Sequence, residues 1–223
     1  MTSPANMDLE RLYKKRFDPN AEYRCGVWTI LVSKFFSRFI SPGDTVLDLG
    51  CGYGEFINAV QAKNRLAMDM NPAAKTRLSA GIRFFLQDNS EPWNGIPQNS
   101  LDMVFSSNLF EHLPDKTAVV GALREAHRCL KPGGRLIALG PNIKYLGGRY
   151  WDFWDHHLPL TENSLSEVLC AEGFSIDLCI GRFLPFTMSS GRRYPLFFVK
   201  LYLALPFLWR LFGRQFLIVA RKQ

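Results

Sequence analysis

The sequence predicts an α/β protein in which a parallel sheet is covered by helices on both faces. Short apolar runs alternate with amphipathic stretches along most of the chain. These runs lack the polar alternation of half-exposed strands, so their strands are expected to be buried on both faces. With 223 residues, of which 47% are hydrophobic, the chain can bury a substantial core, and intrinsic disorder is excluded.

Two helices are predicted at the start of the chain. The first, near residues 8–17, is charged. The second, near residues 21–39, carries apolar residues at helical spacing, namely Val27, Ile30, Leu31, Phe35 and Phe39. Ser41-Pro42-Gly43 then breaks the helical pattern.

Strands and further helices follow in alternation. The clearest helix covers residues 116–130, and Lys131-Pro132-Gly133-Gly134 is expected to end it in a turn. The strands are predicted from the apolar runs at 45–50, 65–70, 82–88, 101–107, 134–140, 174–180 and 215–221.

Basic residues gather in the C-terminal part of the chain. The net charge is +7, and residues 182–223 contain basic residues but no acidic one. Because this excess is confined to one apolar segment, binding of nucleic acid through a basic surface is not expected.

Residues 194–212 are almost entirely apolar, with Lys200 and Arg210 as the charged exceptions. These cations and Pro206 make the segment a poor transmembrane span. One alternative is a helix lying in a membrane surface, with Arg193, Lys200, Arg210 and Arg214 in one stripe. The other is a lid or dimer seam, formed by one helix or by two that break at Pro206.

The cysteines and the N-terminus favour a cytoplasmic location. The five cysteines form no CxxC pair and show no zinc-binding spacing. No apolar secretory region is visible near the N-terminus.

The strongest motif is VLDLGCGYGEF at residues 46–56, where a buried strand ends in glycines and a helix follows. Gly50 allows a tight turn, and Gly52 lets a ligand approach the backbone. Gly54 begins a helix whose amide groups favour a carboxylate or phosphate. The G-x-G-x-G spacing differs from the G-x-G-x-x-G/A pattern expected for pyrophosphate binding.

Polar residues also end the next three strands. Asp69 stands nineteen residues after Gly50, where an acid can accept both hydroxyls of a ribose. Asp88 and Asn89 can hydrogen-bond an adenine amine, and Ser107-Asn108-Leu109 ends the fourth strand. Each alone can cap a turn, but four strand ends at one sheet edge indicate a single binding crevice.

Taken in order, these motifs resemble those of the class I S-adenosylmethionine-dependent methyltransferases. The resemblance lies in VLDLGCGYGEF (46–56), MDMNP (68–72), LDMVFSSNLFEHL (101–113) and LREAHRCLKPGGRLIALGPN (123–142). The segment from Trp151 to Arg221 also resembles small bacterial methyltransferases of polysaccharide and lipid-linked glycan biosynthesis.

The resemblance implies a Rossmann-like three-layer α/β/α sandwich. Its seven-stranded sheet would have the order 3-2-1-4-5-7-6, with the last strand antiparallel. Residues 1–223 would form a single domain. Its parts would be a helical cap (1–40), a cofactor-binding core (41–180), a basic apolar helical insertion (182–213) and the last strand (214–223).

The resemblance also implies S-adenosyl-L-methionine as cofactor and S-adenosyl-L-homocysteine as product. Asp48 and the glycine loop would hold the methionine part, Asp69 the ribose and Met70 the adenine face. Asp88 and Asn89 would contact the adenine edge, and Tyr13 would close over the cofactor. The expected cofactor residues are Tyr13, Asp48, Gly50, Cys51, Gly52, Gly54, Asp69, Met70, Asp88, Asn89, Asn108 and Leu109.

Methyl transfer from a sulfonium is an in-line displacement, for which the protein aligns the acceptor and excludes water. A hydroxyl acceptor also benefits from a base, and His112 of the Glu111-His112 pair is predicted in that role. The alternative is that this pair serves structure alone. Ser106 and Ser107 stand where some quinone-precursor methyltransferases have metal-binding acids, so no metal is expected.

The segment YWDFWDHH, residues 150–157, is predicted to form the acceptor pocket. His156 is a second candidate base, while Trp151, Trp154, Asp155 and His157 are expected to contact a flat or sugar-like substrate. A metal cluster is disfavoured because consecutive histidines rarely face the same way. The remaining alternative is an aromatic loop packed over the edge of the domain.

The sequence therefore predicts methyl transfer to a small-molecule, glycan or lipid-linked acceptor, with oxygen favoured. One alternative is a non-catalytic adapter that binds the cofactor and docks through residues 194–212. The other is a nicotinamide-dependent oxidoreductase, which the glycine spacing opposes. Nucleic acid is not an expected partner, because residues 107–110 lack an Asn-Pro-Pro-Tyr motif. We expect the protein in the cytoplasm, with contact to the inner face of the membrane as an open possibility.

Overall fold

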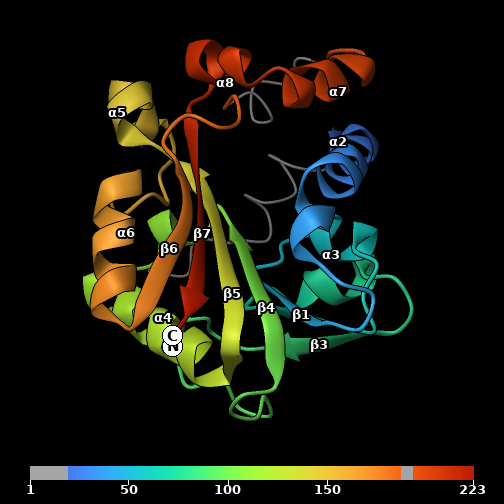
Figure 1. Cartoon of the computed structure of the whole chain (residues 1–223), viewed down its shortest axis with the longest axis vertical. Coiled ribbons are helices and arrows are strands. Elements are labelled where there is room, and N and C mark those ends of the chain that lie inside the picture. The colour runs from blue at the N-terminus through green and yellow to red at the C-terminus, as the bar shows by residue number, and fades with distance from the viewer. Residues whose placement is uncertain (1–19, 187–192) are drawn as a thin grey trace, which may run out of the picture.

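A computed structural model describes residues 20–186 and 193–223, so the predicted helix at 8–17 lies outside the described residues. The described strands form one seven-stranded sheet in the order β3-β2-β1-β4-β5-β7-β6 (Figure 1). They are β1 (Thr45–Leu49), β2 (Asn64–Asp69), β3 (Ile82–Leu86), β4 (Leu101–Ser107), β5 (Leu130–Pro141), β6 (Phe174–Ile180) and β7 (Gln215–Lys222). β7 runs antiparallel to both of its neighbours, and the other pairs are parallel, which confirms the predicted fold class.

Helices cover both faces of this sheet (Figure 1). On one face lie α4 (Lys116–Cys129) and α6 (Glu162–Ala171), and on the other lie α2 (Ala21–Lys34) and α3 (Glu55–Ala59). The shorter elements are η2 (Phe36–Phe39), η3 (Pro72–Arg77), η4 (Phe110–His112), α5 (Ile143–Leu146) and η5 (Gly147–Asp152).

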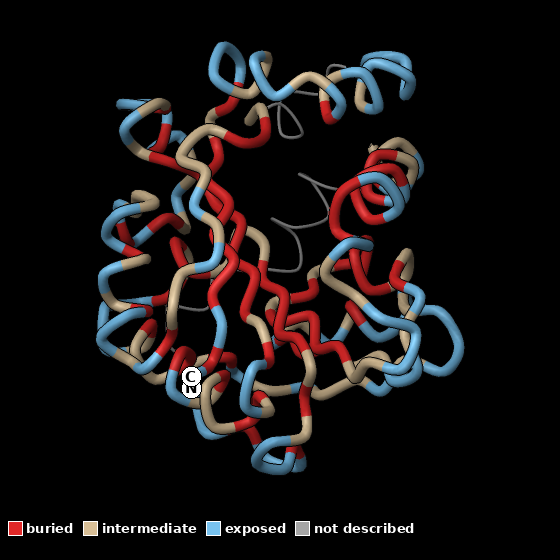
Figure 2. The backbone as a smooth tube through the Cα atoms, viewed as in Figure 1, coloured by how far each residue is buried: buried red, intermediate tan, exposed pale blue. Residues whose placement is uncertain are grey.

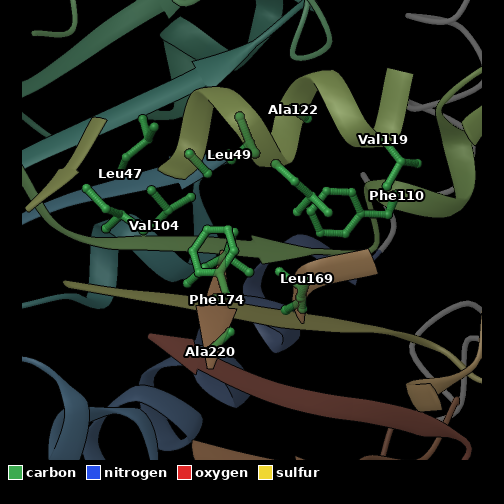
Figure 3. Packing of buried hydrophobic residues seen from close by; sticks show 14 of the residues in the cluster. Leu47, Leu49, Val104, Phe110, Val119, Ala122, Leu169, Phe174 and Ala220 are labelled. Carbon is green, nitrogen blue, oxygen red and sulfur yellow. The ribbon is translucent and has the colours of Figure 1, made fainter. Parts of the chain in front are cut away.

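The core consists of two hydrophobic clusters, one on each face of the sheet. Successive residues of β1 alternate between them, since Leu47 and Leu49 belong to one cluster and Val46 to the other. Figure 3 shows Val119 and Ala122 of α4 directed toward the strands of the first cluster. The central strands are therefore buried on both faces, and Figure 2 shows them coloured as buried along most of their length.

Two local predictions differ from the structure. The second predicted helix stops at Lys34, and residues 36–39 form a tighter 3₁₀ turn. The predicted turn at 131–134 lies within β5, which follows α4 directly. There the ladder with β4 shifts register between Leu101 and Met103, and Gly133 adopts a left-handed φ of 76°. The glycine lets the chain form this irregularity without a separate turn.

The apolar segment between β6 and β7 forms two helices, α7 (Phe197–Ala204) and α8 (Pro206–Phe212). The break occurs at Pro206, which can begin a helix but cannot continue one. A basic stripe along one continuous helix is therefore wrong. Within residues 20–186 and 193–223, no helix is long and apolar enough to cross a membrane.

Candidate active site

A cavity of about 280 Å³ lies at the carboxyl ends of β1 and β4. Ligands of open α/β sheets bind at this edge, because parallel strands deliver their following loops to the same place. Residues from both predicted halves of the site line this one cavity: Asp48, Gly50, Cys51 and Gly52 from the cofactor set, and Asn108, His112, Asp155 and His156 from the fourth strand onward.

The glycine loop turns sharply at the end of β1. Gly50, Gly52 and Gly54 all have left-handed φ values, of 70°, 54° and 75°. A Cβ at Gly50 would lie 2.9 Å from Leu109, so Leu109 packs directly on the loop. A Cβ at Gly52 would meet nothing within 4 Å, so the backbone there borders open space that a ligand can enter.

Three buried carboxyl groups surround this loop: Asp48, Glu55 and Asp69. Burial raises the pKa of each, and the neighbouring acids raise that of Asp48 further. Glu55 forms a buried ion pair with Arg24 of α2. The loop side of the cavity is therefore rich in acidic groups, an arrangement that favours a bound cation.

Asp69 organises the loop through its carboxylate. One oxygen accepts a hydrogen bond from Gly52 N and the other from Asn71 N, each at 2.8 Å. Carboxylate oxygens can accept further bonds, so this geometry leaves Asp69 able to bind hydroxyl groups of a ligand.

The thiol of Cys51 is buried beside the same acids. Burial, followed by the charges of Asp48 and Asp69, raises its pKa. The side chain therefore stays a neutral thiol and is not a nucleophile.

The residues predicted to hold the adenine are not among those that line the cavity. Met70 is half exposed after β2. Asp88 accepts hydrogen bonds from Ser90 N and Ser90 Oγ, so its side chain closes a turn. Asn89 is buried, and its Oδ1 has no hydrogen-bond partner within the described part of the chain. Because buried polar atoms are normally hydrogen-bonded, Asn89 is the one of these three residues whose side chain has a buried oxygen that could accept a hydrogen bond from a ligand.

The loop after β4 carries a strained residue. Asn108 has a left-handed φ of 53°, lines the cavity, and has a buried Oδ1 with no partner among the described residues. Such strain in a residue other than glycine commonly marks a functional position.

His112, Asp155 and His156 come together in the lining of the cavity. The Nδ1 atom of His112 lies 2.8 Å from the backbone oxygen of Asp155 and 3.4 Å from a carboxylate oxygen of the same residue. The rings of His112 and His156 have centroids 4.8 Å apart. The two candidate bases, far apart in sequence, are thus neighbours.

Glu111, which precedes His112 in the chain, also lines the cavity and is almost fully buried. Burial raises the pKa of its carboxyl group to about 8. Its Oε1 has no hydrogen-bond partner among the described residues, and its backbone oxygen accepts from His157 N and Leu158 N. The carboxyl group is therefore protonated at neutral pH.

Glu111, His112 and His156 could together hold a metal ion, since their ligand atoms lie within 4.8 Å of one another. Ligands of one divalent ion are roughly 3–3.5 Å apart, given metal–ligand bonds near 2.1 Å. These side chains would have to move closer to bind one.

Other predicted residues lie away from the cavity lining. Trp154 is 78% exposed, Trp151 is half exposed, and His157 is exposed. Tyr13 lies outside the described residues. Several lining residues were not predicted as site residues. Tyr53, Glu55, Phe56, Phe105 and Phe153 lie within the motifs quoted from the sequence, whereas Arg24, Trp28, Phe186 and Gln215 lie outside them.

Comparison with known proteins finds similarity to methyltransferases. Residues 47–138 match the family model described as a methyltransferase domain. A malonyl-[acyl-carrier protein] O-methyltransferase of Paenibacillus sp. is 31% identical over 64% of this chain and 59% of its own length. A demethylmenaquinone methyltransferase of Symbiobacterium thermophilum is 24% identical over 71% of this chain and 72% of its own length.

Among solved structures, a SAM-dependent methyltransferase from Archaeoglobus fulgidus shares the fold with a TM-score of 0.70. It is 19% identical to this chain, and the match covers 96% of this chain and 100% of that one.

Proposed function

We propose that this chain, which belongs to the class I S-adenosylmethionine-dependent methyltransferases, transfers a methyl group to a hydroxyl of a small-molecule, glycan or lipid-linked acceptor. One observation carries the proposal: the glycine loop and His112 border the same cavity. A cofactor on the loop and an acceptor beside His112 would then meet without leaving it.

The residues of the loop fit the cofactor S-adenosylmethionine. This cofactor supplies an electrophilic methyl group on a positively charged sulfur, which becomes a neutral thioether in S-adenosylhomocysteine. Asp48 and Asp69 offer acidic groups to a cationic ligand, while the open space at Gly52 admits it close to the backbone. Asp69 and the buried Asn89 are the residues we expect to bind the ribose and the adenine edge.

His112 is suited to act as the general base. A carbonyl oxygen can only accept a hydrogen bond, so Nδ1 must carry the ring proton that it donates to Asp155. The neutral ring then has its basic lone pair on Nε2. With a hydroxyl acceptor beside Nε2, this nitrogen would take the hydroxyl proton as the oxygen gains the methyl group and the bond from that carbon to sulfur is lost. The Asp155 carboxylate stabilises the resulting imidazolium.

Glu111 assists this role by staying neutral. Its Oε1 lies 3.9 Å from His112 Nε2, and a carboxylate at that distance would favour a permanently protonated ring. Because the raised pKa keeps Glu111 protonated at neutral pH, His112 remains able to accept a proton.

The acceptor side favours a small substrate with an apolar or ring-shaped part. Phe153, Phe186 and Trp28 line the cavity together with the polar Asp155 and Gln215. The name of the Paenibacillus relative indicates transfer to an oxygen atom, which supports an oxygen acceptor here without distinguishing a hydroxyl from a carboxylate. We propose a cytoplasmic location, with the acceptor presented at the inner face of the membrane.

Calorimetry tests the cofactor directly. We expect micromolar binding of S-adenosylmethionine and S-adenosylhomocysteine by the purified protein and no binding of NAD. Transfer of a labelled methyl group to a panel of lipid-linked sugars and hydroxylated small molecules then tests the reaction. Binding without transfer to any acceptor would favour the non-catalytic adapter, and NAD binding alone would favour the oxidoreductase.

A further inference from the structure

We propose that α7 and α8 form a platform that docks on an anionic lipid bilayer. The platform comprises residues 193–212, and its outer face is apolar although it is exposed. The exposed large apolar side chains are Tyr194, Leu196, Phe197, Phe198, Leu201, Phe207, Leu211 and Phe212. Soluble proteins rarely expose so many large apolar side chains in one contiguous region without a binding partner.

The inner face of the platform is fixed on the core. The Trp209 ring packs against Phe183 and Phe35, with centroids 5.0 Å and 5.9 Å away. Trp209 Nε1 donates to the Tyr202 backbone oxygen at 2.8 Å, and the Tyr202 hydroxyl donates to the Phe183 oxygen at 2.6 Å. The outer side chains are thus held outward by a rigid base and do not collapse onto the protein.

The positive charge of the platform indicates an anionic partner. Arg193, Lys200 and Arg210 are exposed among the apolar side chains, and residues 182–223 contain no acidic residue. Exposed phenylalanines that enter the acyl boundary, with cations at the level of anionic headgroups, are the two components of interfacial membrane binding. A second copy of the same platform would bring Lys200 and Arg210 of the two copies together, and residues 193–212 carry no acidic residue to pair with them, which disfavours a dimer seam.

The helices are too short to span the bilayer. Eight residues of α7 and seven of α8 extend only about 10–12 Å each, against a hydrocarbon core of about 30 Å. The geometry therefore favours helices lying in the plane of the interface.

The platform also stands at the edge of the sheet that carries the cavity. β6 ends and β7 begins at the carboxyl edge of the parallel strands, so the insertion between them leaves from this edge (Figure 1). α2 links the two sites, since its Arg24 and Trp28 line the cavity and its Tyr23 hydroxyl accepts from Tyr194 N at 3.2 Å. A bilayer bound to the platform would thus face the end of the molecule where an acceptor enters.

Vesicle co-sedimentation of the full chain tests the platform. We expect binding to vesicles of phosphatidylcholine with 30% phosphatidylglycerol and at least tenfold weaker binding to phosphatidylcholine alone. The variant Phe197→Ser/Phe207→Ser/Phe212→Ser should lose binding. Lys200→Gln/Arg210→Gln should weaken it about fivefold per removed cation, because each contributes about 1 kcal/mol at an anionic surface.

Matched controls separate the platform from general surface effects. Leu86→Ser removes an exposed apolar side chain elsewhere, and Arg83→Gln/Lys116→Gln removes two exposed cations elsewhere. Both should bind vesicles like the unaltered protein. Equal binding to neutral vesicles, or unaltered binding by the triple serine variant, would overturn the proposal.

Sedimentation velocity without lipid tests whether the platform instead binds a second copy of this chain. We expect a monomer for both the unaltered protein and the triple serine variant. A dimer that this variant converts to monomer, together with no vesicle binding, would instead identify the platform as a contact between copies. None of these measurements requires methyl transfer, so the docking proposal can fail while the enzymatic proposal stands.

Discussion

The two sides of the cavity are assembled in different ways. The cofactor side comes mainly from one continuous segment, residues 48–56, in which the buried Asp48 near the end of β1 is followed by left-handed glycines and the buried Glu55. The acceptor side combines Glu111 and His112 with Phe153, Asp155 and His156, and adds Phe186 and Gln215 from either end of the insertion. The first side depends on local backbone geometry, and the second depends on tertiary packing.

This difference has a functional meaning. A cofactor common to many enzymes can be bound by a fixed local motif, whereas the acceptor side can change residue by residue without disturbing the loop. Substitutions on the two sides should therefore separate cofactor affinity from turnover.

The largest effect is expected at Asp69 on the cofactor side. Asp69→Ala removes the acceptor for the ribose hydroxyls and the contacts to Gly52 N and Asn71 N. We expect a loss of S-adenosylmethionine affinity of roughly 100-fold or more, since hydrogen bonds to charged groups contribute about 1.5–3 kcal/mol each. Calorimetry measures the affinity, and circular dichroism checks the fold. Retained affinity in a folded variant would remove the ribose role.

Substitutions on the acceptor side should lower turnover and leave cofactor affinity unchanged. His112→Asn removes the base, and we expect kcat to fall about 100-fold with cofactor affinity unchanged. Steady-state kinetics at saturating acceptor and calorimetry provide the two readouts. His127→Asn is a control, because this histidine lies on α4 beside Phe174, away from the cavity. If His112→Asn turns over like the unaltered protein, His112 is not the base, and His156→Asn then tests the second candidate.

The raised pKa of Glu111 makes the stability of the folded protein depend on pH. Its folded pKa of about 8 exceeds the ordinary value of 4.5, so the unfolded chain releases this proton at lower pH than the folded one. Stability is therefore lost as pH rises from about 4.5 to 8. Glu111→Gln abolishes this loss, so its Tm should exceed that of the unaltered protein by about 5–10 °C at pH 8 and differ little at pH 5. Thermal unfolding across that pH range measures the difference, and a pH-independent gap contradicts the assignment.

Metal removal should have little effect. A protonated Glu111 is a poor ligand, and the three candidate groups are spread over up to 4.8 Å. We expect kcat to change less than about twofold after dialysis against EDTA. A loss of activity that Zn²⁺ or Mn²⁺ restores would reassign Glu111, His112 and His156 as metal ligands.

The smallest effect is expected at Trp154. This side chain is 78% exposed and does not line the cavity. Trp154→Ala should change KM for the acceptor by less than about twofold, as is usual for surface substitutions. Phe153→Ala, one residue earlier but lining the cavity, should raise KM at least about fivefold. Acceptor titrations of both variants compare the two neighbours.

The contrast between a locally encoded cofactor side and an acceptor side built by tertiary packing also explains what the sequence could predict. The strand order, the glycine loop and Asp69 follow from apolar periodicity and from a contiguous motif that resembles a known family. Arg24 could not be found in this way, because its partner Glu55 is brought to it only when α2 packs on α3. Similarly, the sequence of residues 150–157 predicts aromatic and acidic chemistry, but only the fold determines that Phe153 and His156 point inward while Trp154 points to solvent.

Trp28 gives the cavity an intrinsic spectroscopic reporter. It lines the cavity and packs edge-on against Phe56 and Phe105, with ring centroids 6.1 Å and 5.8 Å away. A ligand that enters beside it will alter the polarity around the indole and hence its emission. The exposed Trp151 and Trp154 contribute background emission, which Trp151→Phe/Trp154→Phe would remove, leaving Trp93 and Trp209 as the other emitters. Fluorescence titration can then follow occupancy in real time, without a labelled cofactor or a known acceptor.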